Sequence, residues 1–438
     1  MTMRPSASLR ARSHIVIFWL TVLTAASRTS ALLLALPWLA LQETGSATIV
    51  GALGALTLLA GQLLAPLLML FADRLGRWRT AVAADVLTLA GCGAAALLVE
   101  AGMFTVAAMM VLGPLLAIGR GVGSATRKAL VPDLAEEHRV RYSTVTAGRE
   151  VMIVAGFVVS PIVSGYMLVD GASGASVFWM CVGFSLLSMV GMLLIPRHLG
   201  VVEHTDPGGF SVIRTPRRSL VSTMREHPAL TRAVLMTAAV AAVAAVFQQV
   251  GAPVIAESIG DSDQLGLLIA GYALGSVAGV GLHVLAARTL GRFSTVVFGV
   301  ALGVLGFALL PFLLEAGWAP GVGALVGAGL GMTNPLWATA TAEYSPHHAR
   351  STVVAAQVLA AGAVGGLAPL AAGIGVEHLG VVPVMWVVAT YWAGCCLLWL
   401  WRADTELTPR VIGQQMSPSF EQSGVNDHQS SGASRPTA

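Results

Sequence analysis

The sequence predicts an all-α membrane protein whose twelve transmembrane helices form two six-helix pseudo-repeats. Hydrophobic residues make up 55% of the 438 positions, and mean hydropathy is +0.77. Only 11% of the residues are charged, whereas a soluble domain carries about 25%. Long apolar runs recur along the chain, and the charges between them alternate in sign from loop to loop. These observations exclude a soluble globular protein.

The apolar runs are long enough to cross a hydrocarbon core of about 30 Å. The first run follows Arg4, Arg10 and Arg12, so a signal peptide cleaved near Ala25-Ala26-Ser27 is the competing interpretation. The run continues well past that point, and we expect it to remain as an uncleaved first helix. The expected spans are 14–42, 46–71, 80–99, 103–123, 143–168, 175–195, 230–256, 264–287, 294–314, 318–342, 352–376 and 381–401.

Charge placement predicts the topology, because cytoplasmic loops carry an excess of Lys and Arg. The loops that this count places outside contain acidic residues and no Lys or Arg. We therefore expect a multi-pass protein of the cell (inner) membrane with both termini in the cytoplasm. The predicted inside segments carry Arg74, Arg77, Arg79, Arg127, Lys128, Arg139, Arg141, Arg197, Arg214, Arg217, Arg218, Arg225, Arg288, Arg292, Arg350 and Arg402, and the outside loops carry Glu43, Glu100, Asp170, Glu257, Asp261, Asp263, Glu315 and Glu377.

The longest predicted cytoplasmic loop divides the spans six and six. We expect an N-terminal half at 1–196, a linker at 197–229 and a C-terminal half at 230–401. Residues 402–438 are polar and contain few large apolar side chains, which predicts a disordered cytoplasmic tail.

The two halves share sequence anchors at matching positions. Ser143-Thr144-Val145 opens the fifth span, and Ser351-Thr352-Val353 opens the eleventh. The same interval then leads to Ser160-Pro161 with Gly165 and to Ala368-Pro369 with Gly373. Duplicated halves of this kind are typical of transporters built from parallel repeats.

Several motifs resemble the major facilitator superfamily. Asp73, Arg74, Gly76 and Arg77 match its loop 2–3 motif, G-x-x-x-D-(R/K)-x-G-(R/K)-(R/K), although Met69 replaces the leading glycine. Segments 35–47, 127–134 and 149–150 resemble the macrolide-efflux and siderophore-exporter branch. The fifth span resembles the exporter motif G-x-x-x-G-P-x-x-G-G, with serine at two glycine positions; its matching residues are Gly156, Ser160, Pro161, Ser164 and Gly165.

The resemblance implies a secondary active transporter that works by alternating access. It favours a proton-coupled antiporter that exports an amphiphilic small molecule, such as a drug, a macrolide-like or a siderophore-like compound, and so supports multidrug resistance. An importer or lipid flippase on the same fold, or a non-transporting membrane sensor or scaffold, are the alternatives.

Polar residues inside the spans are the candidate substrate site, since such residues are costly in lipid. The resemblance implies that spans 1, 4, 7 and 10 surround the cavity. Arg28 and Thr24 in span 1, Gln248 and Gln249 in span 7 and Asn334 in span 10 lie at similar predicted depth. Arg28 either attracts an anionic or zwitterionic amphiphile or pairs structurally with a carboxylate such as Asp85, and both interpretations remain open.

A second group of charges lies near the cytoplasmic ends of the spans. Asp85, Arg120, Arg149 and Glu150, together with the loop 2–3 motif, are candidates for an inner charge network. A desolvated carboxylate there would suit proton exchange, whereas a permanently ionised salt bridge is the favoured alternative for each residue.

No motif predicts catalysis. A phosphate-binding G-x-x-x-x-G-K-(S/T) sequence and a His-based metal motif are both missing from the sequence. We therefore expect no enzyme, no cofactor and no nucleic-acid partner. The expected partners are a small-molecule substrate, protons and the lipid bilayer, and the protein is expected to be monomeric.

Overall fold

The computed structural model describes residues 5–64, 68, 76–169, 174–199, 228–259, 262–289, 291–310, 312, 318–344 and 350–403. All regular secondary structure in these ranges is helical. The first group of helices comprises α1 (Pro5–Thr44), α2 (Ala47–Leu59) with its π-helical continuation η1 (Ala60–Leu64), α4 (Arg77–Glu100), α5 (Val106–Glu137), α6 (Tyr142–Val169) and α7 (Ala175–Leu194).

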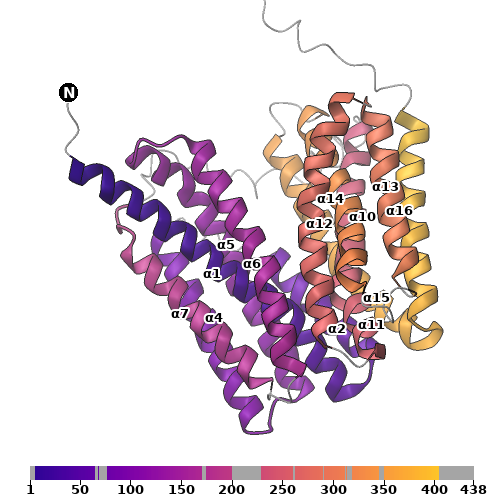
Figure 1. Cartoon of the computed structure of the whole chain (residues 1–438), viewed down its shortest axis with the longest axis horizontal. Coiled ribbons are helices and arrows are strands. Elements are labelled where there is room, and N and C mark those ends of the chain that lie inside the picture. Colours follow the sequence, from indigo (N-terminus) through magenta and orange to yellow (C-terminus); the bar gives the residue numbers. More distant parts are fainter. Residues whose placement is uncertain are drawn as a thin grey trace, which may run out of the picture. The chain divides into compact units, whose positions relative to one another are not determined.

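The second group begins with a helix that changes its winding twice. It comprises α10 (Pro228–Val246), which continues through the π-helical η3 (Phe247–Gly251) into α11 (Ala252–Ile259), then α12 (Ser262–Thr289), α13 (Gly291–Leu309), α14 (Ala319–Tyr344), α15 (Arg350–Leu379) and α16 (Val381–Ala403). Each of the twelve expected spans coincides with one helix or with one such continuous run, and the all-helical prediction is confirmed (Figure 1).

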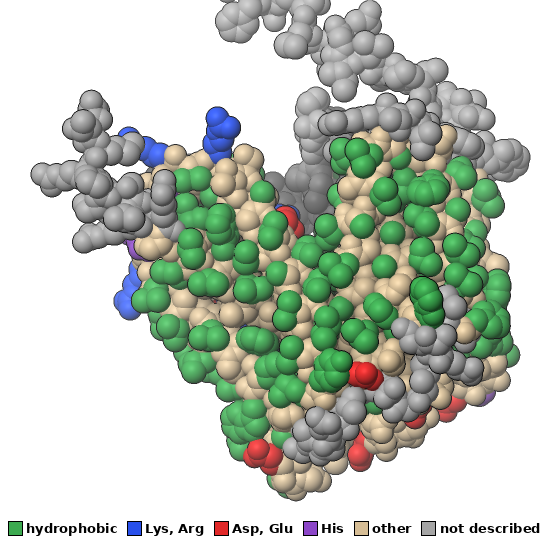
Figure 2. Space-filling view, in the orientation of Figure 1, with side chains coloured by type: hydrophobic (Ala, Val, Ile, Leu, Met, Phe, Trp, Pro, Cys, Tyr) green, Lys and Arg blue, Asp and Glu red, His purple; other side chains and the backbone are tan. Residues whose placement is uncertain are grey.

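The outer surface of the described helices suits lipid. Nine helices in the described part are long and apolar enough to cross a membrane, and shorter apolar helices cover Ala47–Gln62 and Ser294–Leu309. Large apolar side chains such as Leu187 and Val387 remain exposed on helix faces. Figure 2 shows apolar side chains spread over this surface, with charged side chains mostly near its ends. In water such a surface would promote aggregation, whereas a bilayer solvates it.

Helix α5 corrects one sequence-based boundary. The fourth span was expected to end near residue 123, with Arg127 and Lys128 in a cytoplasmic loop. Instead α5 continues to Glu137, and Arg127 is buried inside the bundle. The loop prediction was wrong because it assumed that a charged residue ends a span. A buried Arg is tolerated here because Asp85 and Ser188 bind its guanidinium.

The described residues up to Leu397 form one compact unit. The expected split at the linker therefore stays a prediction. Residues 200–227 of that linker and 404–438 of the tail lie outside the described residues.

Two helix pairs make the most extensive contacts between the first group of helices and the second. Helix α2 packs against α15, and α6 packs against α12. Both contacts bring backbones together: a Cβ added at Gly51 would lie 2.3 Å from the Pro369 carbonyl oxygen, and one at Gly266 would lie 2.4 Å from that of Pro161. The two prolines are the repeated anchors of the sequence, so equivalent elements make equivalent contacts in both halves.

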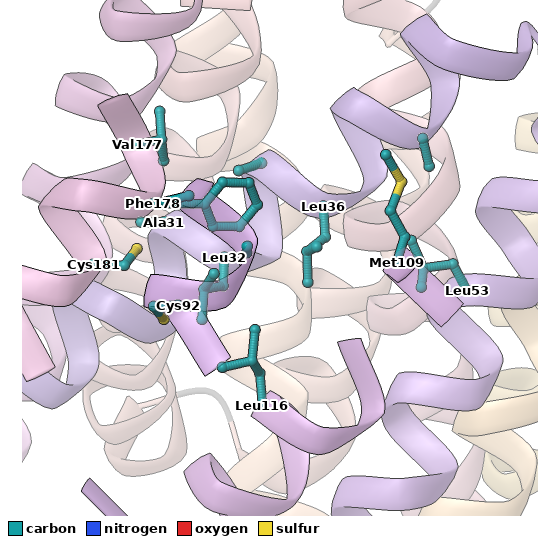
Figure 3. Packing of buried hydrophobic residues seen from close by; sticks show 14 of the residues in the cluster. Ala31, Leu32, Leu36, Leu53, Cys92, Met109, Leu116, Val177, Phe178 and Cys181 are labelled. Atoms are coloured by element: carbon teal, nitrogen blue, oxygen red, sulfur yellow. The ribbon is translucent and has the colours of Figure 1, made fainter. Parts of the chain in front are cut away.

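An apolar cluster stabilises the first group of helices (Figure 3). Leu32 and Leu36 of α1 contact side chains from α2, α4, α5 and α7, among them Leu53, Leu116 and Phe178. Leu53, Leu116 and Phe178 are each at most 2% exposed. This cluster joins five helices, of which α1, α2 and α5 also line the adjoining cavity.

Candidate functional site

A cavity of about 820 Å³ lies between α1, α2, η1, α5 and α6 on one side and α10 and η3 on the other. Small and apolar residues form much of its wall, with glutamines and cations between them. Its described lining residues are Val22, Ala25, Ala26, Arg28, Thr29, Leu33, Leu58, Gly61, Gln62, Ala117, Arg120, Gly121, Ser124, Ala125, Arg127, Lys128, Arg149, Ile153, Phe157, Ala241, Ala244, Ala245, Gln248 and Gln249.

Both π-helical turns contribute to this wall. Gly61 and Gln62 belong to η1, and Gln248 and Gln249 belong to η3. A π-helical turn holds an extra residue, and such turns occur often at functional sites. Gln249 is 4% exposed and packs beside Gly54 of α2, where an added Cβ would lie 3.0 Å from the Gln249 Cβ. The structure thus places the predicted Gln248 and Gln249 at the cavity.

Asp85 is the centre of a buried charge cluster beside the cavity. Its carboxylate accepts hydrogen bonds from the Arg127 guanidinium and, at 3.5 Å, from Arg28 Nη1. Ser188 Oγ donates to Asp85 Oδ2 at 3.2 Å, and Arg28 Nη1 donates to Ser185 Oγ at 3.2 Å. Asp85 is fully buried and Arg28 is 2% exposed. Arg28 therefore lines the cavity while one edge of its guanidinium is held by a carboxylate.

Arg120 and Lys128 differ from the other cavity cations. Neither has a hydrogen-bond or ion-pair partner among the described residues. Arg120 is half-buried in the middle of α5, and Lys128 is exposed two turns further along the same helix. The cavity wall therefore contains two cations whose charge is not matched by an adjacent carboxylate in the described part of the chain.

The remaining predicted charges form separate pairs. Arg149 contacts Glu150, whose side chain is 59% exposed. Arg77 binds Asp133 at 3.1 Å and also donates to the Ala129 carbonyl oxygen, which joins the start of α4 to α5. Gly76 adopts a φ of +87° just before α4, a conformation that glycine allows without strain. Asp73 and Arg74 lie outside the described residues.

Two predicted cavity residues do not line it in the described part of the chain. Thr24 is half-buried on α1, and its hydroxyl donates to the carbonyl oxygens of Leu20 and Thr21. Asn334 is exposed on α14, a helix that contributes no described lining residue. The two glutamines chosen by their depth along a span do line this cavity, whereas depth did not reveal which face of α1 or α14 turns towards it.

The predicted exporter-like residues of α6 pack against neighbouring helices. Gly156 lies against α1, since an added Cβ would be 2.8 Å from the Ser27 nitrogen, and Ser160 Oγ donates to the Ser27 carbonyl oxygen at 2.7 Å. Pro161 and Gly165 contact Gly266 of α12. These four residues therefore lie at helix contacts, and none of them is a described lining residue.

Sequence reasoning missed Gln62, Arg127 and Lys128 as cavity residues. The spacing along α5 could have indicated Arg127 and Lys128. They follow Arg120 by seven and eight residues, or about two helical turns, and so lie on nearly the same face of the helix. This spacing was not recognised, because the fourth span was expected to end at residue 123.

In the described part of the chain, the cavity is open at one end of the bundle and closed at the other. Gln62, Ser124 and Lys128 are exposed at one end. At the opposite end, Glu377 of α15 accepts hydrogen bonds from Ser46 Oγ at 2.8 Å and from the Thr48 nitrogen at 3.0 Å, which caps the start of α2. The Gly51 and Gly266 contacts reinforce this closed end.

The family model described as Major Facilitator Superfamily matches residues 17–369 and 252–418. The multidrug efflux pump Tap of Mycolicibacterium fortuitum is 24% identical over 378 residues, which cover 83% of this chain and 89% of the pump.

Solved structures share the fold. A variant of the nucleoside transporter NupG aligns with a TM-score of 0.76 at 11% identity and covers 88% of this chain and 99% of its own. A D-xylose-proton symporter aligns with a TM-score of 0.65 at 17% identity, covering 89% of this chain and 96% of its own.

Proposed function

Because the chain belongs to the Major Facilitator Superfamily, we propose that it is a proton-coupled efflux transporter for an amphiphilic small molecule. The observation that best supports this proposal is the cavity between the two groups of helices. Its wall is largely apolar and contains a few amides and cations. Binding sites for small molecules have this composition, because apolar surface provides affinity and a few polar groups fix orientation. The resemblance to a multidrug efflux pump supports export over import.

The different contacts at the two ends of the cavity support alternating access as the mechanism. By the positive-inside rule, the exposed Lys128 end faces the cytoplasm and the Glu377 end faces outward. The described arrangement then corresponds to a carrier that admits substrate from the cytoplasm. Export requires the α2–α15 and α6–α12 contacts to separate while the inner end closes, so that the substrate leaves on the other side.

We assign the proton-accepting role to the inner charge network, and in it to Asp85. Among the described residues that line the cavity there is no Asp or Glu, so the nearest buried carboxylate is the one that contacts Arg28 and Arg127. Protonation would weaken both contacts and let the two guanidiniums reorient, which is a way to link a proton to a rearrangement of α1, α4 and α5.

Everted membrane vesicles test this proposal. Vesicles that contain the protein should accumulate labelled amphiphiles from a mixed panel, and the accumulation should fall when a protonophore collapses the pH gradient. Vesicles carrying Asp85→Asn should no longer accumulate the amphiphile with or without the gradient, while they still exchange labelled for unlabelled amphiphile across the membrane, which shows that the variant is folded. Accumulation only in right-side-out vesicles would indicate an importer, and movement of labelled phospholipid alone would indicate a flippase. No movement of any compound would contradict a transport function.

A further inference from the structure

We propose that Arg120 binds the anionic group of the transported amphiphile, so that the substrates are carboxylates, sulfonates or phosphate esters with an apolar body. This inference rests on the proposed transport function and adds the substrate class and the recognising residue. It also assigns the role of counter-charge to Arg120 of α5 in place of Arg28 of α1, which was the candidate from the sequence.

The charge balance of the cavity is the first argument. Five cations line it, namely Arg28, Arg120, Arg127, Lys128 and Arg149. The carboxylates paired with them are Asp85, shared by Arg28 and Arg127, and Glu150 at Arg149. The described wall thus carries excess positive charge. A cationic amphiphile would be repelled there, whereas an anion would bind without first breaking an ion pair.

The position of Arg120 is the second argument. The guanidiniums of Arg28, Arg127 and Arg149 each donate at least one hydrogen bond to a carboxylate of the protein. Arg120 is half-buried, faces the cavity and has no partner in the described part of the chain. A cation in that setting is costly unless an anion reaches it. The planar guanidinium offers paired donors that match the two oxygens of a carboxylate, sulfonate or phosphate.

The surroundings of Arg120 provide a place for the apolar body. A second, much smaller space of about 20 Å³ lies beside the cavity and is lined by Arg120, Gln249 and apolar side chains such as Leu36 and Leu53. Leu33, Ala117, Arg120 and Gln249 line both spaces, so Arg120 lies where they meet. A ligand whose anionic group binds Arg120 can place its apolar body in the main cavity, against side chains such as Leu33 and Phe157.

Lys128 suits a different step of the same process. It is exposed at the open end of the cavity, about two helical turns from Arg120 on the same helix. An exposed cation beside a positively charged cavity attracts anions toward the opening and raises their local concentration. We therefore assign binding to Arg120 and attraction to Lys128.

The test uses two fluorescent probes that differ by one sulfonate: anionic 1-anilinonaphthalene-8-sulfonate and neutral N-phenyl-1-naphthylamine. Uptake of each is measured in everted vesicles that contain the full-length protein, Arg120→Gln, Arg120→Lys or the control Arg79→Gln. Arg79 is an exposed arginine of α4 and does not line the cavity, so its replacement removes the same charge at a different place.

We expect the unmodified protein to transport the sulfonate, and Arg120→Gln to lower its uptake at least tenfold while uptake of the neutral probe changes less than twofold. Arg120→Lys should restore part of the sulfonate uptake, and Arg79→Gln should behave like the unmodified protein. The melting temperature of each purified variant in detergent should match that of the unmodified protein, which shows independently of transport that the variant is folded.

Three results would overturn the inference. One is transport of the neutral probe but not of the sulfonate by the unmodified protein, which leaves the transport function in place and removes the anionic substrate class. The second is unchanged sulfonate uptake in Arg120→Gln. The third is an equal loss with both probes in Arg120→Gln and in Arg120→Lys, which identifies a structural residue. Failure to move either probe or any compound of the mixed panel contradicts the transport function itself.

Discussion

Asp85 holds the buried charges of the first group of helices together. It is fully buried, and its partners Arg28 and Arg127 are each 2% exposed. Removing one member of a buried ion cluster leaves the others uncompensated, and this costs much more than the cluster adds to stability while intact. The two arginines, however, are not equivalent, because Arg127 approaches Asp85 more closely than Arg28 does.

We therefore predict that Asp85→Asn lowers the free energy of unfolding by about 3–5 kcal/mol, because it leaves two buried guanidiniums without a carboxylate. Arg28→Gln should cost clearly less, since Asp85 keeps Arg127 as a partner. Chemical unfolding in detergent provides the measurement. The matched control is Asp133→Asn, which removes the half-exposed partner of Arg77 and should cost at most about 1 kcal/mol. Equal losses for Asp85→Asn and Asp133→Asn would contradict a stabilising role for the buried cluster.

His138 makes stability depend on pH. It follows the end of α5, and its ring lies 5.3 Å from the ring of His14. Burial, and next the neighbouring His14, lower the pKa of His138 below its ordinary value of 6.5, while Glu137 acts in the opposite direction. The folded state therefore binds fewer protons at His138 than the unfolded state does. Its contribution to stability is fully present above pH 6.5 and is lost as pH falls through the lowered pKa.

We predict that the melting temperature in detergent decreases between pH 7.5 and pH 5.5, and that His138→Asn reduces this decrease. The control His198→Asn changes an exposed histidine that pairs with Glu137, and it should leave most of the pH dependence in place. If His138→Asn leaves the pH dependence of the melting temperature unchanged, other groups cause that dependence.

For the helices, the sequence was sufficient to predict the spans, but it did not predict which face of each helix points toward the cavity. Hydropathy and charge placement predicted all twelve helical runs, because the bilayer imposes length and polarity on each helix independently of its neighbours. The cavity depends on rotation and packing between helices. Gln249 reaches it through a π-helical turn that hydropathy does not report, and Arg127 reaches it because α5 is longer than its apolar run.

The repeated Pro–Gly anchors acquire a specific role at this scale. Pro161 and Gly165 of α6 contact Gly266 of α12, and Pro369 and Gly373 of α15 contact Gly51 of α2. Glycine allows the backbones to approach closely, as is typical of helix contacts in membranes. In the proposed mechanism both contacts separate when the closed end opens, so we expect side-chain size at these glycines to affect the balance between the two states.

We predict that Gly266→Ala favours opening of this end, because the added methyl group would lie 2.4 Å from the Pro161 carbonyl oxygen. The distance between a spin label on α6 and one on α12 should be longer in a larger fraction of the molecules than it is in the unmodified protein. The control is Gly281→Ala on the same helix, where an added Cβ meets no atom within 4 Å, so the distances should not change. Identical distance distributions in both variants would remove the gating role of the contact.

At the scale of the whole molecule, direction of transport depends on orientation in the membrane. Loop charges predict that the end containing Lys128 faces the cytoplasm, and the proposed path of the substrate from this open end to the Glu377 end requires the same orientation. Both arguments fail together if the orientation is reversed.

Site-directed labelling gives the decisive measurement, and the native cysteines create little background, since Cys92, Cys181 and Cys396 are buried and Cys395 is half-buried. We predict that Ala101→Cys reacts in sealed cells with a thiol reagent that does not cross membranes. Ala101 is exposed in the turn after α4 and therefore on the predicted outer side. Ser143→Cys, exposed at the start of α6 on the predicted inner side, should react only after the cells are permeabilised. The reverse pattern would invert the predicted topology and place the open end of the cavity outside the cell, which would contradict entry of substrate from the cytoplasm in the described arrangement.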